Sequence, residues 1–169
     1  QEGVVSIDVS GNLVGDLSSR EIARVRMSPT PYTWGVMLAN NHLYASDMIS
    51  GFWQLDPVSL QPVAGGNNVT ERYGADLWVK GSVAYTGTWG GAPREGARGN
   101  AVKIWSLSGT GAPAIADSIV IEGIYSISDI EVSDNGRLLV FSVEGPTDAG
   151  LYVYDLENPR KPKLIASIV

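Results

Sequence analysis

The sequence repeats itself at intervals of about 50 residues, and this period limits the fold more than any other feature. Four segments of one kind recur, each an apolar or alternating run that ends in a polar residue and a turn. Short runs rich in β-branched and aromatic residues are typical of β-strands. The polar residues at the four equivalent positions are Asp8, Asp56, Ser106 and Asp155.

Each full repeat carries signals for four short strands. The recurring segment is one of these strands. Two further strands precede it and are joined to each other by a tight turn. The clearest such turn is Ser133–Gly136, whose Asn-Gly pair supplies the positive φ that a two-residue hairpin needs. One more strand follows the marker. The only plausible helical turn, Ser18–Val25, falls in phase with a fourth strand. The pattern predicts an all-β chain of four-stranded antiparallel β-propeller blades, whereas a barrel or sandwich would not explain a four-strand period.

The chain begins at the third strand of a blade and therefore contains about three and a half blades. We expect a single propeller segment with a half blade at 1–27 and full blades at 28–66, 67–122 and 123–169. Propellers generally close with about 4–8 blades, and an open set exposes sheet edges and apolar faces that proteins normally cover. We therefore expect copies of the chain, or other propeller segments, to complete the fold.

Charge and composition exclude several classes of partner and site. The chain has 12 Lys+Arg against 18 Asp+Glu, a formal charge of -6, which argues against nucleic acids and anionic membranes as partners. No apolar run approaches the roughly 18 residues that a membrane span needs, so no membrane insertion is expected. The absence of cysteine excludes disulfides and thiolate sites, and the single histidine, His42, excludes a site built from two imidazoles.

The third full blade opens with Ser128-Asp-Ile-Glu-Val, turns at Asn135-Gly136, and has a strand ending at Asp155 before the spaced prolines Pro159 and Pro162. In these features it resembles the blades of LVIVD-repeat propellers. The resemblance covers nearly the whole chain, although its motifs are short. It implies an extracellular or cell-surface bacterial protein with no established common reaction. Residues 31–56 resemble the final blade of such proteins and 68–134 their opening blade, so the blade order looks permuted, with a seam at 63–67.

Acidic residues are expected near one rim, where the loops entering the first strand meet those joining the second and third strands. They are Asp47, Asp76, Asp129 and Glu144, with Trp34 at the position that matches Asp76 and Asp129. Converging carboxylates are able to bind Ca²⁺. Alternatively, each carboxylate caps its own loop by accepting backbone N–H bonds. No D-x-D-x-D-G spacing is present, so we favour capping and predict neither a metal site nor a cofactor.

The longest loop runs from Trp89 to Asn100 and is rich in glycine. Trp89, Arg94 and Arg98 are candidate anchors of a recognition loop, because aromatic and arginine side chains dominate binding hot spots. A plain flexible excursion explains the same composition equally well. The loop is not a phosphate loop, since no Gly-Lys-Ser/Thr follows it.

These observations lead to a non-catalytic binding or scaffold module, with no catalytic residue assigned. The alternative is a secreted hydrolase that acts on sugars or esters through carboxylates at the rim. A third interpretation is a structural array of stacked repeats. An enzyme would require a buried polar constellation with perturbed carboxyl pKa values, whereas a module needs only exposed anchors.

Overall fold

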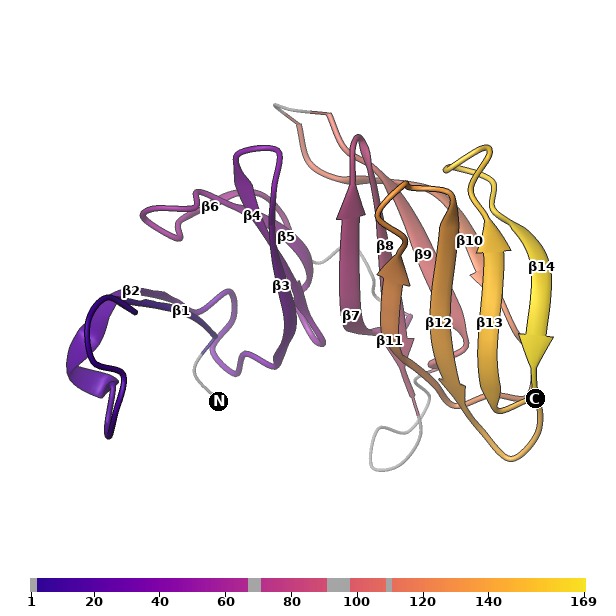
Figure 1. The fold of residues 1–169 in the computed structure, drawn as a ribbon, viewed down its shortest axis with the longest axis horizontal. Coiled ribbons are helices and arrows are strands. Elements are labelled where there is room, and N and C mark those ends of the chain that lie inside the picture. Colours follow the sequence, from indigo (N-terminus) through magenta and orange to yellow (C-terminus); the bar gives the residue numbers. More distant parts are fainter. Residues whose placement is uncertain (1–2, 67–70, 91–97, 109–110) are drawn as a thin grey trace.

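The computed structural model describes residues 3–66, 71–90, 98–108 and 111–169. Antiparallel strands dominate, and the single helical element in these ranges is a short 3-10 turn, η1 (Ser18–Arg20). The strands form groups that follow one another along the longest axis, with the N-terminal group and the last group at opposite ends (Figure 1). The predicted all-β fold of propeller blades, about three and a half in number, is confirmed.

The N-terminal part contains a two-stranded group and a complete blade. The first group, which we call the half blade, pairs β1 (Val4–Ile7) with β2 (Glu21–Val25). Blade 1 has the strand order β3-β4-β5-β6. Its strands are β3 (Thr33–Ala39), β4 (His42–Asp47), β5 (Gly51–Leu55) and β6 (Pro62–Gly65).

The C-terminal part contains two further blades of the same order. Blade 2 comprises β7 (Tyr73–Lys80), β8 (Val83–Trp89), β9 (Ala101–Ser106) and β10 (Ala114–Val120). Blade 3 comprises β11 (Ser126–Val132), β12 (Leu138–Glu144), β13 (Gly150–Asp155) and β14 (Lys163–Ile168). A single pair, Ser126 with Trp89, links blades 2 and 3 into one continuous hydrogen-bonded sheet.

Tight turns fix the register of the inner two strands of each blade. In blade 1 the turn residues Asn40 and Asn41 both have positive φ, at 50° and 58°. This is the conformation of a type I′ hairpin, which asparagine tolerates better than other non-glycine residues. Gly81 and Gly136 take positive φ in the corresponding turns of blades 2 and 3. The turns expected from the sequence are therefore where the inner hairpins reverse.

The hydrophobic core lies between the blades, because each blade buries one face against its neighbour. The half blade packs Val4 and Val25 against blade 1. Blades 1 and 2 share a cluster around Phe52 and Trp105, and blades 2 and 3 share one around Tyr85 and Phe141. By contrast, the outermost strand β14 is exposed along its whole length. This layered burial is what a stack of blades requires.

The innermost strands β3, β7 and β11 lie side by side (Figure 1). Gly35 on β3 lies against β7 so closely that an added Cβ would be 2.7 Å from Oδ1 of Asp76. On the other side of β7, the backbone N–H of Ile130 donates to Oδ2 of Asp76 at 3.3 Å. The carboxylate of Asp76 thus links β7 to β11 and lies close against β3.

Candidate functional site

The inner hairpins bring the two predicted sets of loops to one rim. At this end the first inner strand of each blade begins where the second one ends. The terminal pairs are Thr33 with Asp47, Tyr73 with Trp89, and Ser126 with Glu144. Backbone bonds cross between neighbouring loops, since the N–H of Gly74 donates to the carbonyl of Met48 at 3.1 Å.

Asp47 is fully buried and acts as a loop cap. Its Oδ1 accepts bonds from the backbone N–H and the Oγ–H of Ser50, both at 2.8 Å, and from the N–H of Ile49 at 3.1 Å. Its Oδ2 accepts the N–H of Tyr32 at 2.7 Å. These donors occupy the carboxylate, which is the capping role that the sequence also allowed.

Glu144 lies at the equivalent end of β12 and is exposed. Its carboxylate accepts the hydroxyl of Ser128 at 2.9 Å, and its backbone carbonyl accepts the N–H of Tyr125 at 2.7 Å. The two bonds tie the end of β12 to β11 and to the residue that precedes it. Glu144 therefore has a local structural role at the rim, as Asp47 has in blade 1.

Asp76 and Asp129 lie on the inner strands, and their environments differ. Burial raises the pKa of the Asp76 carboxyl, and the nearby charges of Asp129 and Glu131 act in the same direction. Asp129 itself is exposed. Within the described ranges, no three histidine or acidic side chains gather as ligands for a metal ion. Since Asp47 and Glu144 hold loop groups and Asp76 bridges strands, the arrangement does not support the hydrolase alternative.

An aromatic pair marks the rim between blades 1 and 2. The rings of Trp34 and Trp89 lie 5.1 Å apart and are tilted by 37°. This separation is within the range of favourable aromatic contacts. Trp34 is exposed, whereas Trp89 is half-buried. The sequence identified Trp89 as an anchor but did not include Trp34 among the candidate anchors.

In β3 the residue equivalent to Asp76 is Gly35. The sequence alignment, which placed Trp34 at this position, was therefore wrong by one residue. Counting back from the hairpin turns, Val36 pairs with Ala45 as Leu77 pairs with Thr86. At the other end of the strands, Thr33 pairs with Asp47 as Gly74 pairs with Thr88, which gives the same correspondence. Because the matching residue is glycine, β3 is able to approach Asp76 closely.

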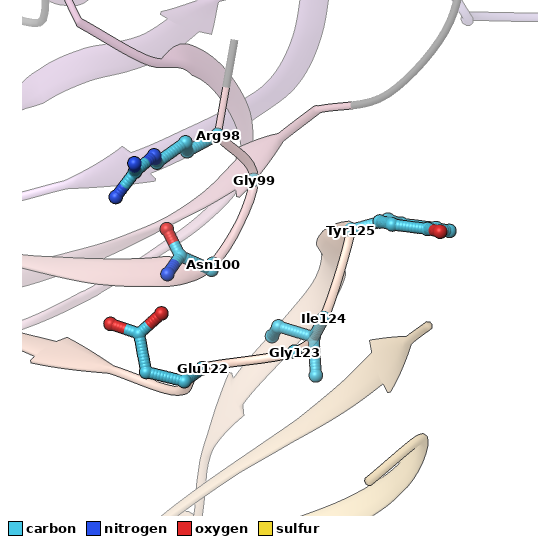
Figure 2. Close-up of a pocket in the computed structure, with 7 residues that line it drawn as sticks. All are labelled: Arg98, Gly99, Asn100, Glu122, Gly123, Ile124 and Tyr125. Atoms are coloured by element: carbon cyan, nitrogen blue, oxygen red, sulfur yellow. The ribbon is translucent and has the colours of Figure 1, made fainter. Parts of the chain in front are cut away.

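Arg98 lines a pocket of about 330 Å³ between blades 2 and 3, at the same rim. Figure 2 shows Arg98, Asn100 and Glu122 on one side of this pocket, while the ring of Tyr125 points away from them. The volume falls at the lower end of the range for small-molecule sites. Arg94, the other arginine predicted in this loop, lies outside the described residues.

A network of charged side chains fixes the orientation of the Asn100 side chain. The guanidinium of Arg72 donates from Nε and Nη2 to Oδ1 of Asn100, each at 3.3 Å. Glu71 binds Arg72 at 3.0 Å and Lys103 at 2.6 Å. The Lys103 hydrogen bond is the largest cause that lowers the pKa of Glu71 to about 2. With its oxygen occupied by Arg72, Asn100 is left to present its NH₂ group as a donor.

Comparison with solved structures supports the fold. The β-propeller domain of Cps50 (Swd1) from Myceliophteria thermophila aligns with a TM-score of 0.60 at 10% identity, covering 82% of this chain and 41% of that domain. The chain has a propeller-like fold. The computationally designed Ika4 protein aligns with a TM-score of 0.59 at 13% identity, covering 88% of this chain and 78% of that one.

A third similar structure is a hypothetical selenium-binding protein from Sulfolobus tokodaii. It aligns with a TM-score of 0.59 at 14% identity, over 80% of this chain and 35% of that protein. This chain thus spans only about two-fifths or less of the two natural proteins it resembles. No family model and no curated protein matches the sequence. At these identities the likeness shows the fold alone.

The described part of the chain contains no helix with the length and apolar character needed to cross a membrane.

Proposed function

We propose that this chain is a non-catalytic binding or scaffold module whose blades associate with other propeller segments, further copies of itself included. The observation that carries the proposal is that, within the described residues, the stack of blades is open at both ends. At the N-terminal end the half blade leaves the inner strand of blade 1 uncovered. At the C-terminal end, no described part of the chain lies against the second face of blade 3 (Figure 1).

The two open faces differ in character. The N-terminal one exposes Val36 and Leu38, both on β3. The C-terminal one combines apolar residues such as Leu151 with the carboxylates of Asp129 and Glu131, which line a shallow pocket of about 210 Å³. Exposed apolar patches bordered by polar groups are typical of interaction sites.

The rim supplies the second element of the proposal, a surface for a bound partner. The Trp34–Trp89 pair and the pocket beside Arg98 lie at the same end of the blades. Aromatic and arginine side chains are the usual anchors of such surfaces. The resemblance to LVIVD-repeat propellers supports including in this proposal a bacterial protein that acts outside the cell or on its surface.

Light scattering on a size-exclusion column tests the association. We expect a mass at a multiple of 18.0 kDa that falls on dilution. Introducing a charge at an open face, Leu151→Asp at the C-terminal end, should shift the mass to that of one chain. Val63→Asp, on the outer strand β6, is the matched control and should leave the mass unchanged. A monomer at every concentration would contradict self-association.

A further inference from the structure

The pocket beside Arg98 depends on neither end of the chain. The residues that line it belong to two short segments, 98–100 and 122–125. The first segment leads into β9 of blade 2, and the second leads into β11 of blade 3. Both blades have all four of their strands. The walls of the pocket are therefore formed by two complete neighbouring units.

Backbone contacts hold these walls in place. The carbonyl of Asn100 accepts the N–H of Ile121 at 2.9 Å, and the N–H of Tyr125 donates to the carbonyl of Glu144 at 2.7 Å. Gly99 packs so closely against the other segment that an added Cβ would collide with the carbonyl oxygen of Tyr125. A ligand thus meets walls that are already ordered, which lowers the entropic cost of binding.

Asn100 is a buried polar residue that opens into the pocket. The residue is only 4% exposed, and Arg72 occupies its Oδ1 from two nitrogen atoms. Its NH₂ group has no hydrogen-bond partner among the described residues, yet it is not one of the atoms sealed in the interior. A donor that is buried and fixed in orientation gains from an acceptor placed in the pocket.

Two charged side chains flank Asn100. Arg98 and Glu122 are both exposed, and neither has a hydrogen bond or an ion pair within the described ranges. Figure 2 shows the NH₂ group of Asn100 turned toward the carboxylate of Glu122, with the guanidinium of Arg98 on the opposite side of Asn100. The pocket thus presents a cationic donor, a neutral donor and an acceptor in that order.

The space between Asn100 and Glu122 indicates the chemistry of the ligand. A hydroxyl group is able to accept a bond from the NH₂ group and to donate its own proton to the carboxylate. An ammonium group only donates, and a carboxylate only accepts, so neither bridges the two. A zwitterion would have to pair with the exposed charges of Arg98 and Glu122 separately, and exposed ion pairs contribute little.

We propose that this pocket binds a neutral carbohydrate through two neighbouring hydroxyl groups. One hydroxyl accepts from Asn100 and donates to Glu122, and the next accepts from Arg98. The apolar lining supplied by Ile124 suits the C–H groups of a sugar ring. The inference rests on the rim surface of the proposed function and names the class of ligand that this surface takes.

A titration followed by nuclear magnetic resonance tests the proposal directly. The probes are glucose, galactose, mannose and N-acetylglucosamine, each also as a disaccharide, added to the ¹⁵N-labelled chain. We expect the side-chain NH₂ signals of Asn100, identified by their loss in Asn100→Asp, to shift with saturation for at least one probe. No shift of these signals with any of the sugars would overturn the proposal.

Asn100→Asp also tests the donor itself. The substitution keeps the oxygen that Arg72 binds and replaces the NH₂ group with a second oxygen. We expect it to weaken binding of the responding sugar by about tenfold or more, because the site then lacks its buried donor. The backbone amide signals of 122–125 give this affinity, since the side-chain signals are absent. Unchanged affinity would overturn the assignment of Asn100.

Two matched pairs of variants locate the site. Glu122 and Glu157 are both exposed, but Glu157 lies in the turn between β13 and β14, at the opposite end of the blades. Glu122→Ala should weaken binding by about tenfold, whereas Glu157→Ala should change it by less than about twofold. Arg98→Ala and Arg137→Ala form the second pair, because the exposed Arg137 also lies at the opposite end. Equal affinities within either pair would contradict the proposal.

Salt dependence separates a neutral sugar from a charged ligand. Raising the salt concentration from about 0.01 M to about 1 M should leave sugar binding unchanged within about twofold, since no ion pair forms. Glycine, a zwitterion without a hydroxyl group, should not shift the Asn100 signals. A shift with glycine that disappears at high salt, in the absence of a response to any sugar, would overturn the inference.

This titration is independent of the mass measurement. Sugar binding by a chain that stays a monomer would contradict self-association and support the pocket. An oligomer whose Asn100 signals respond to no sugar would support association and overturn the pocket. Failure of one proposal is therefore distinguishable from failure of the other.

Discussion

At the scale of single residues, the rim carboxylates are distinguished by how completely their oxygens are occupied. Asp47→Ala would leave the buried N–H groups of Tyr32 and Ser50 without their acceptor. We expect a loss of about 2–3 kcal/mol in the free energy of unfolding, measured by urea denaturation.

The matched control for Asp47→Ala is Asp56→Ala. Asp56 accepts the same set of bonds, from the N–H of Val58 and from the N–H and Oγ–H of Ser59, but in a more exposed turn. Water is able to replace its carboxylate there, so the loss should be clearly smaller than for Asp47→Ala. Equal losses for the two variants would show that the burial of Asp47 does not matter.

Part of this residue-level arrangement is readable from the sequence. An aspartate followed three residues later by a serine, as in Asp47–Ser50 and Asp56–Ser59, is the pattern of a capped turn. The contact between Trp34 and Trp89 is not readable in this way. It joins the first strand of blade 1 to the second strand of blade 2, and a local pattern does not show how neighbouring blades stack.

At the scale of elements, the turn between β13 and β14 is fastened to blade 2. The hydroxyl of the buried Tyr85 donates to the carbonyl of Pro159 at 2.7 Å, and Arg160 donates to Ser106 Oγ at 2.8 Å. Burial raises the pKa of Tyr85 to about 12. Tyr85→Phe should lower the free energy of unfolding by about 1 kcal/mol at neutral pH, because the carbonyl loses its donor.

The pH dependence gives an independent check on Tyr85. The pKa of Tyr85 is higher in the folded chain than its ordinary value of 10.0, so its contribution to stability is complete below pH 10. The contribution is lost as the pH rises from there through about 12. Ultraviolet titration should show one tyrosine of the wild type ionising near pH 12 that Tyr85→Phe lacks. Identical titration curves would contradict the assignment.

The repeat period is sufficient to predict the elements of this fold. Four strands per unit, reversed at Asn40–Asn41 and Asn135–Gly136, follow from local hairpin signals. The pocket beside Arg98 is not predictable in the same way. It depends on Asn100 being held by Arg72, and the two residues, 28 positions apart, directly precede different strands, β9 and β7. Contacts of this range are set by how strands stack, which a local pattern does not encode.

At the scale of the whole molecule, a stack of blades should be stabilised mainly by contacts between neighbouring units. Two matched substitutions test whether the N-terminal end is open in solution. Leu77→Ala removes a buried side chain from the contact between blades 1 and 2, and should cost about 2–5 kcal/mol in the free energy of unfolding. Leu38→Ala makes the same change on the same face of β3.

Because no unit covers Leu38, Leu38→Ala should change the free energy of unfolding of the single chain by no more than about 0.5 kcal/mol. Urea denaturation of both variants, at concentrations where light scattering shows single chains, gives the comparison. Similar losses for the two variants would mean that something in the chain covers β3 and that the N-terminal face is closed.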